Sequence, residues 1–286
     1  MVVISMFTIS LKSLMVAAMV TVAMVVGCYE AYEIFTNFSL QWYWFVFALF
    51  YSVVINEYFG HFCCGHKLFD VDTRRITYKI LAFLNCVDHA WGPPSSMSLT
   101  HANHHMYADQ GRKDSINPRV HYLTWFMSPT HYLYTIPTEW PDKENYFAAQ
   151  DKLFHHIVHD PWTQFCEKNS HWLTVIYWAI LYAVFPLFLF KVVFLGRVLV
   201  GVYTQFGGVL AHGKNIGGYR NFDSNDLSYN KLFLHYLCLC LVPSMLHNNH
   251  HGSAYNFSKG HQVRFFELDL SVYPMRLIKF LLQKKD

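Results

Sequence analysis

The sequence predicts an all-α integral membrane protein, with four transmembrane helices in two hairpins and a cytosolic helical cap that holds a histidine-rich metal site. Charged residues make up only 14% of the chain and hydrophobic residues 53%, whereas soluble domains usually carry about 25% charged residues. We therefore expect lipid to replace water over much of the surface. All 18 histidines fall outside the long apolar segments. The 286 residues suffice for one such domain, over residues 1–286.

The four transmembrane helices are expected at residues 13–30, 36–57, 172–190 and 192–211. A helix needs roughly 20 apolar residues to cross a bilayer, and Arg197 is the only charged residue inside these segments apart from their ends. Ten Lys and Arg residues lie between His61 and His171, and nine lie between His212 and Asp286. Because positive residues favour the cytosolic side, we expect both termini and the cap, residues 61–171 and 212–286, to be cytosolic.

Charge and cysteine usage exclude other classes of protein. The net charge is only +3 and no Lys/Arg block is present, so we expect no nucleic-acid partner. The seven cysteines form no C-x-x-C pair, which argues against a disulfide framework or a thiolate zinc site.

Three groups of histidines carry the chemical signal. The first is H-x4-H, the second and third are H-x-x-H-H, and together they contain His61, His66, His101, His104, His105, His247, His250 and His251. Positions i, i+3 and i+4 share one face of an α-helix, so each triplet can serve two metals side by side. A spacing of five diverges on a regular helix, so the first pair is expected to reach different metals, unless the helix ends at Gly65.

The number of these histidines favours a dinuclear redox site over a structural one. Imidazole suits iron, zinc, copper and nickel, but zinc has no redox chemistry and a structural zinc needs only four ligands. Solvated or pH-sensing histidines are the alternative interpretation. The chain carries no G-x-G-x-x-G or other nucleotide motif, so electrons are expected from a separate carrier, such as a ferredoxin or a b-type cytochrome.

In these motifs the chain resembles the membrane-bound fatty acid desaturase family, and especially its acyl-CoA (delta-9 type) branch. Three stretches carry the resemblance: H-A-N-H-H-M-Y-A-D-Q from His101, A-H-G-K-N-I-G-G-Y-R-N-F-D from Ala211, and H-N-N-H-H followed by F-F-E-L-D. The resemblance implies two Fe²⁺ ions, O₂ as co-substrate, a cis double bond in a fatty acyl chain, with acyl-CoA favoured as the substrate, and His212 as a ninth ligand.

The sequence departs from the family pattern at Gly208, Phe62 and the stretch from Pro243 to Leu246, where asparagine, arginine and a Gly-Glu-Gly-like stretch are usual. A hydroxylase or other monooxygenase on the same scaffold is the nearest alternative function, and a non-enzymatic membrane metal carrier is another.

Other histidines and carboxylates are expected either to support the metal ligands or to lie away from them. We expect no metal at the reversed H-H-x-x-H of His155, His156 and His159, and a surface or interfacial position for His235 and His261. Residues that could orient an imidazole N–H are His89, Asp109 and Asp269, with Glu57 and Asp223 as further candidates.

Overall fold

The computed structural model describes residues 42–88, 94–114, 153–185, 210–213, 217–239 and 241–284. Within these ranges the regular elements are helices, joined by loops and a few isolated β-bridges. The expected all-α class is therefore confirmed for the described part of the chain.

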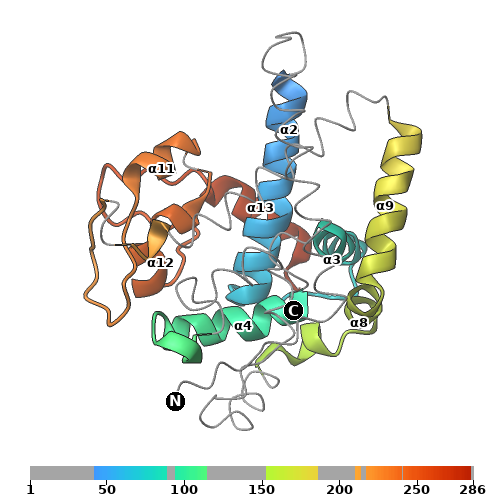
Figure 1. The fold of residues 1–286 in the computed structure, drawn as a ribbon, viewed down its shortest axis with the longest axis horizontal. Helices are drawn as coiled ribbons and strands as arrows, with labels where there is room; N and C mark the ends of the chain where they lie inside the picture. Colours follow the sequence, from blue (N-terminus) through green and yellow to red (C-terminus); the bar gives the residue numbers. More distant parts are fainter. Residues whose placement is uncertain are drawn as a thin grey trace, which may run out of the picture.

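A continuous helical rod runs through the middle of the molecule (Figure 1). Its first half is the α-helix α2, Trp42–Val53, and its second half is the π-helix η1, Val54–Gly65. Almost every residue of η1 is buried, because α3 (Ile76–Asp88), α4 (Pro94–Tyr107) and α13 (Val272–Leu282) all pack against it. This rod is the element around which the other helices are arranged.

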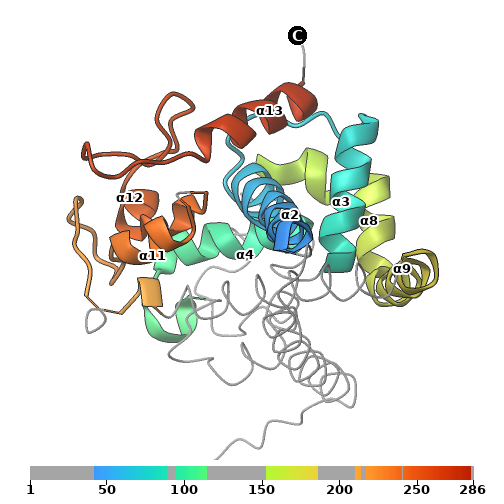
Figure 2. The same ribbon diagram turned by 90° about the horizontal axis from the view of Figure 1, so that it is seen from above.

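Two groups of helices flank the rod on opposite sides (Figures 1 and 2). On one side α3 packs against α8, Pro161–Lys168, and α9, Ser170–Val184. On the other side lie the short helices α11 (Leu232–Leu237) and α12 (His247–Gly252), with the 3₁₀ turn η4 (Pro243–Met245) between them. A second 3₁₀ turn, η2, Gly111–Lys113, follows α4.

Local sequence explains where α8 begins. The Asp160 side chain accepts a hydrogen bond from the Thr163 backbone N–H at 2.8 Å, which satisfies one of the free donors of the first turn. Pro161 occupies the first helical position, where its missing N–H costs nothing and its fixed φ suits the helix.

The apolar core lies where η1, α3 and α13 meet. Tyr58, Phe59 and Phe62 of η1 are fully buried there, together with Tyr78 of α3 and Met275 of α13. The core therefore fixes the rod against the C-terminal helix, and it supports the histidine-bearing end of η1.

Among the described residues, no helix combines the length and the apolarity that crossing a bilayer requires. The expected span 36–57 overlaps α2 and the start of η1, and the span 172–190 overlaps α9. The span 13–30 and almost all of the span 192–211 lie outside the described residues. The four spans and the two hairpins therefore stay a prediction.

Candidate metal centre

The structure brings eight of the nine histidines named from the sequence into two adjoining clusters and places the ninth between them. Cluster A consists of His61, His66, His101 and His250, and cluster B consists of His104, His212, His247 and His251. Within each cluster the ligand atoms lie within 4.8 Å of one another. The ninth histidine, His105, lies between the clusters, in reach of His250 and His251.

The π-helix explains how the first pair of histidines reaches one cluster. A π-helix closes its hydrogen bonds from i+5 to i, and the His66 N–H donates to the His61 carbonyl at 3.1 Å. Residues five apart therefore lie above one another, and the Nε2 atoms of His61 and His66 are 3.3 Å apart. Of the two alternatives for this pair, binding to different metals is wrong, because it assumed α-helical geometry. The other alternative, a helix that ends at Gly65, agrees with the bounds of η1.

The two H-x-x-H-H triplets each serve both clusters, as their spacing predicts. On α4, His101 belongs to cluster A and His104 to cluster B. On α12 the assignment is reversed, since His247 and His251 belong to cluster B and His250 belongs to cluster A. Each helix thus contributes to both clusters, and the first histidine of the triplet belongs to cluster A on α4 and to cluster B on α12.

Distances between the imidazole nitrogens match the edges of a coordination polyhedron. Two nitrogens bound about 2.1 Å from one divalent ion and 90° apart lie about 3.0 Å from each other. In cluster A, His101 Nε2 lies 2.9 Å from His61 Nε2 and 2.8 Å from His66 Nε2. In cluster B, His247 Nε2 lies 2.8 Å from His212 Nε2. His105 Nε2 is 2.9 Å from His101 Nε2 and 3.0 Å from His250 Nε2, both in cluster A, whereas its ring centroid is 4.3 Å from that of His251 in cluster B.

Burial keeps most of these rings in the neutral form that binds metals. Loss of hydration, followed by the repulsion of neighbouring histidines, lowers the pKa well below the usual value for His66, His101, His105, His247, His250 and His251. The pKa of His104 is instead raised. Burial is the largest effect and lowers it, but the Asp114 carboxylate together with Asp109 and Asp226 outweighs burial.

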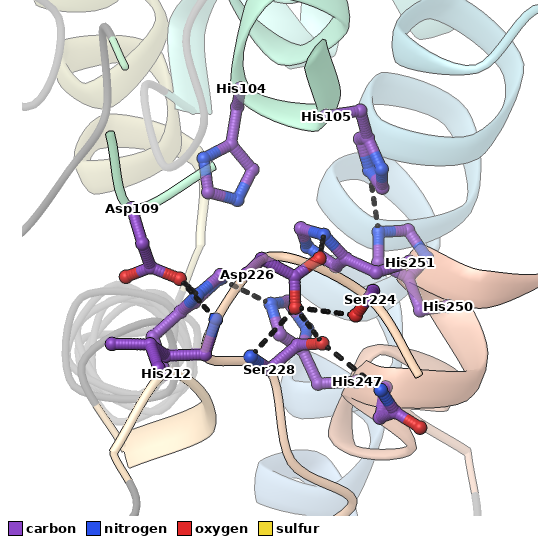
Figure 3. A network of polar contacts seen from close by, with 12 residues as sticks. His104, His105, Asp109, His212, Ser224, Asp226, Ser228, His247, His250 and His251 are labelled. Carbon is purple, nitrogen blue, oxygen red and sulfur yellow. Dashed lines mark hydrogen bonds and ion pairs between the residues drawn. The ribbon is translucent and has the colours of Figure 1, made fainter. Parts of the chain in front are cut away.

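Carboxylates hold several rings through the nitrogen that faces away from the cluster (Figure 3). His212 Nδ1 donates to Asp109 at 2.7 Å, and the same bond helps to lower the pKa of Asp109 although burial opposes it. The corresponding partner of His104 is Asp114, at 2.9 Å, and that of His251 is Asp226, at 3.1 Å. His61 is held by Glu57, at 3.2 Å. Such partners fix the ring orientation and the tautomer.

The other residues named from the sequence lie in different surroundings. Asp269 accepts hydrogen bonds from the backbone N–H groups of His261 and Ser271, so it holds a loop instead of an imidazole. Asp223 is exposed, and His89 lies outside the described residues. His155, His156 and His159 lie on or beside a helix at 153–158 and join neither cluster.

Two histidines assigned to the surface are in fact buried. His235 is 0% exposed and His261 is 2% exposed. His261 Nε2 lies 3.4 Å from the Nδ1 atom of His250, so it is a tenth histidine at the edge of cluster A. The expectation was wrong for these two side chains, because His261 packs against His250 of α12 although most residues beside it in the chain are exposed.

Asparagines occupy the two middle positions of H-N-N-H-H for a structural reason. The Asn248 Oδ1 atom accepts from the backbone N–H groups of Asn221 and Phe222, at 2.7 and 2.8 Å. The Asn249 Oδ1 atom accepts from the side-chain amides of Asn221 and Asn230, both at 2.8 Å. These amides attach α12 to the loop that carries Asp226.

No protein-family model matches the chain. It is similar to the sn-1 stearoyl-lipid 9-desaturase of Synechocystis sp., with 31% identity over 132 residues. The aligned region covers 46% of this chain and 39% of that protein. The similarity is thus a distant and partial homology to a fatty acid desaturase, over less than half of either chain.

Proposed function

We propose that this protein is a di-iron enzyme that uses O₂ to introduce a cis double bond into a fatty acyl chain. The observation that carries the proposal is the convergence of nine histidines from η1, α4, α12 and the 210–213 segment into two adjoining clusters. The partial homology to a desaturase supports the same chemistry.

The donor set fits a pair of iron ions. Imidazole nitrogen is a good ligand for iron, and each cluster offers four ring nitrogens, with His105 as an additional ligand between them. The Nε2 atom of His251 is buried in cluster B and has no hydrogen-bond partner among the described residues, as suits an atom whose partner is a metal ion. The proposed ligands are thus the eight histidines of clusters A and B together with His105.

The residues of the chain bind and orient, and the cofactor does the redox chemistry. Bound iron would supply the activation of O₂ and the removal of two hydrogens from neighbouring methylene groups. The Glu57, Asp109, Asp114 and Asp226 carboxylates hold the imidazole rings, so that the Nε2 lone pairs point into the clusters. Packing of η1 around Phe62 and Tyr58 excludes water beneath cluster A. Electrons would come from a separate carrier, such as a ferredoxin or a b-type cytochrome.

The membrane part of the proposal is supported by exposed apolar side chains. Helix α2 exposes Phe47 and Phe50, and α9 exposes Trp172, Ile176 and Ile180. Exposed apolar surface of this kind marks contact with lipid or with another protein. We therefore propose a multi-pass protein whose clusters and termini face the cytosol, with spans at 13–30, 36–57, 172–190 and 192–211.

The acyl carrier needs a separate test, since the acyl-CoA expectation rests on family resemblance alone. The name of the similar desaturase instead specifies a stearoyl group on a lipid. Purified protein with an electron-donor system should be offered stearoyl-CoA and a stearoyl glycerolipid in parallel. Conversion of one alone would identify the carrier.

Expression in a host that lacks its own desaturase tests the function. Gas chromatography and mass spectrometry should show a fatty acid with two hydrogens fewer, and the position of its double bond. The His250→Ala variant should give no product, whereas His155→Ala, outside both clusters, should behave as wild type. A product with one added oxygen would favour the hydroxylase alternative. Metal uptake into vesicles without any lipid product would favour the metal carrier.

A further inference from the structure

The two clusters differ in the charge that surrounds them. In cluster B, three of the four rings donate from Nδ1 to an aspartate: His104 to Asp114, His212 to Asp109 and His251 to Asp226, at 2.7–3.1 Å. The fourth ring, His247, has its Nδ1 atom 3.0 Å from the Ser244 carbonyl. Every ring of cluster B is therefore held by an oxygen acceptor, and Figure 3 draws the contacts of His212 with Asp109 and of His251 with Asp226.

Cluster A has less support of this kind. Glu57 is the carboxylate bonded to one of its rings, that of His61, at 3.2 Å. His250 has the uncharged ring of His261 behind its Nδ1 atom, at 3.4 Å. The Nδ1 atom of His101 is buried without a hydrogen-bond partner among the described residues. Among these residues, one carboxylate thus supports cluster A and three support cluster B.

The three aspartates of cluster B are themselves held in place. Asp226 accepts from the side chain and the backbone N–H of Ser228 and from the Ser224 hydroxyl. Asp109 accepts from the Leu227 N–H at 2.7 Å, and Asp114 accepts from the Asp109 N–H at 3.0 Å. The turn after α4 and the loop at 224–228 therefore form a connected carboxylate support along one side of cluster B.

The backbone at Asp109 suits this arrangement. Its φ is +63°, in the left-handed region that aspartate tolerates better than most side chains. This conformation ends α4 and turns the chain, so that Asp109 and Asp114 both face histidines of cluster B. The turn after α4 thus positions Asp109 and Asp114 beside the histidines of cluster B.

Two physical effects of this support act in the same direction. A carboxylate on Nδ1 raises the basicity of the imidazole and fixes its orientation. Each negative charge near a buried site also lowers the cost of transferring a divalent cation from water into it. Three charges at cluster B and one at cluster A should therefore give unequal affinities.

We propose that Asp109, Asp114 and Asp226 are positioning residues that make cluster B the tighter of two metal sites, so that it fills before cluster A. This inference rests on the proposed function, because it takes both clusters to be metal sites. Loss of one such partner typically weakens metal binding by 10–100-fold. We expect a loss of affinity of this size at cluster B in the aspartate variants, and at cluster A in Glu57→Gln.

The test is an anaerobic titration of the metal-free full-length protein with ⁵⁷Fe²⁺, followed by Mössbauer spectroscopy. For wild type we expect a tight step and a weaker step, with one spectral component after the first equivalent of iron and a second component after the next. Asp226→Asn should weaken the tight step by roughly 10–100-fold, and Glu57→Gln should leave that step unchanged. Asp223→Asn is the matched control, because Asp223 lies in the same loop but is exposed.

The outcomes separate this inference from the proposed function. Protein that binds no iron at either site would refute the proposed function itself. Two equal steps in wild type, or equal effects of Asp226→Asn and Glu57→Gln on the tight step, would overturn the inference and leave the di-iron proposal intact. Asp114→Asn repeats the measurement from the α4 side, so that a folding defect in one variant does not decide the result. Recovery of the tight step in Asp226→Glu would support a positioning role.

Discussion

A single methyl group at Gly252 should disturb the candidate metal centre, because α12 lies in close contact with the loop around Phe222. A Cβ atom added to Gly252 would lie 2.3 Å from Cγ of Phe222, 2.5 Å from its Cβ and 2.6 Å from its Cδ2. These separations are far below the contact distances of about 3.5–4.0 Å between carbon atoms. Gly252→Ala therefore requires the Phe222 segment or the end of α12 to move.

The segment cannot move without losing hydrogen bonds. The Asn248 side chain accepts from the N–H groups of Asn221 and Phe222 and donates to the Phe222 carbonyl at 3.0 Å. Overpacking a core costs typically 1–3 kcal/mol, and each lost hydrogen bond adds about 1 kcal/mol. We therefore expect Gly252→Ala to lower the free energy of unfolding by about 2–5 kcal/mol. The affinity of cluster B for iron should also fall, because His251 of this cluster directly precedes Gly252.

Thermal unfolding of the purified protein and its iron content measure the effect. A double-mutant cycle with Phe222→Gly, which removes all three clashing atoms, should show a coupling energy that restores much of the loss. The reasoning is refuted if Gly252→Ala unfolds at the wild-type temperature with wild-type iron content. It is also refuted if the effects of the two substitutions simply add.

Two further predictions concern the same centre. Asn249→Ala should lower the free energy of unfolding by about 1–3 kcal/mol, because the buried amide of Asn230 and the partly buried amide of Asn221 lose an acceptor and keep only Glu267; an unchanged thermal midpoint would contradict this role. Metal-free protein should lose stability as the pH falls below about 6.5, because the unfolded chain takes up protons that rings such as His250, with lowered pKa values, do not take up in the folded state. The slope is up to about 1.4 kcal/mol per pH unit for each such histidine, and equal thermal midpoints at pH 7.5 and 5.5 would count against burial of neutral rings.

The division of each histidine triplet between two clusters could be predicted because the geometry of a triplet is local. Residues at i, i+3 and i+4 of an α-helix share a face whatever the tertiary fold, so the division of each triplet between two clusters followed from spacing. For the pair His61 and His66 the spacing left two alternatives, and only the helix end at Gly65 agrees with the structure. The spacing was interpreted on an α-helix, and the sequence offers no simple signal for a twelve-residue π-helix.

The carboxylates that bond to the clustered histidines come from distant parts of the chain, and sequence spacing does not define such contacts. Asp226 meets His251 from a loop 25 residues away, and Asp109 meets His212 across 103 residues. Asp109 and Asp269 were named from the sequence as candidate partners of imidazole rings. Asp114 and Asp226 were not, and only the folded structure places them beside His104 and His251. His261 was assigned to the surface or an interface, but its ring contacts His250, a residue 11 positions away, and this contact buries it.

Iron quantification of active, purified protein shows whether the clustered histidines bind a pair of iron ions. We expect two iron ions per chain, and a loss of iron together with activity when a cluster histidine such as His247 is replaced by alanine. Active protein that contains no iron, or that keeps both ions after this replacement, would mean that the clustered histidines do not bind the pair.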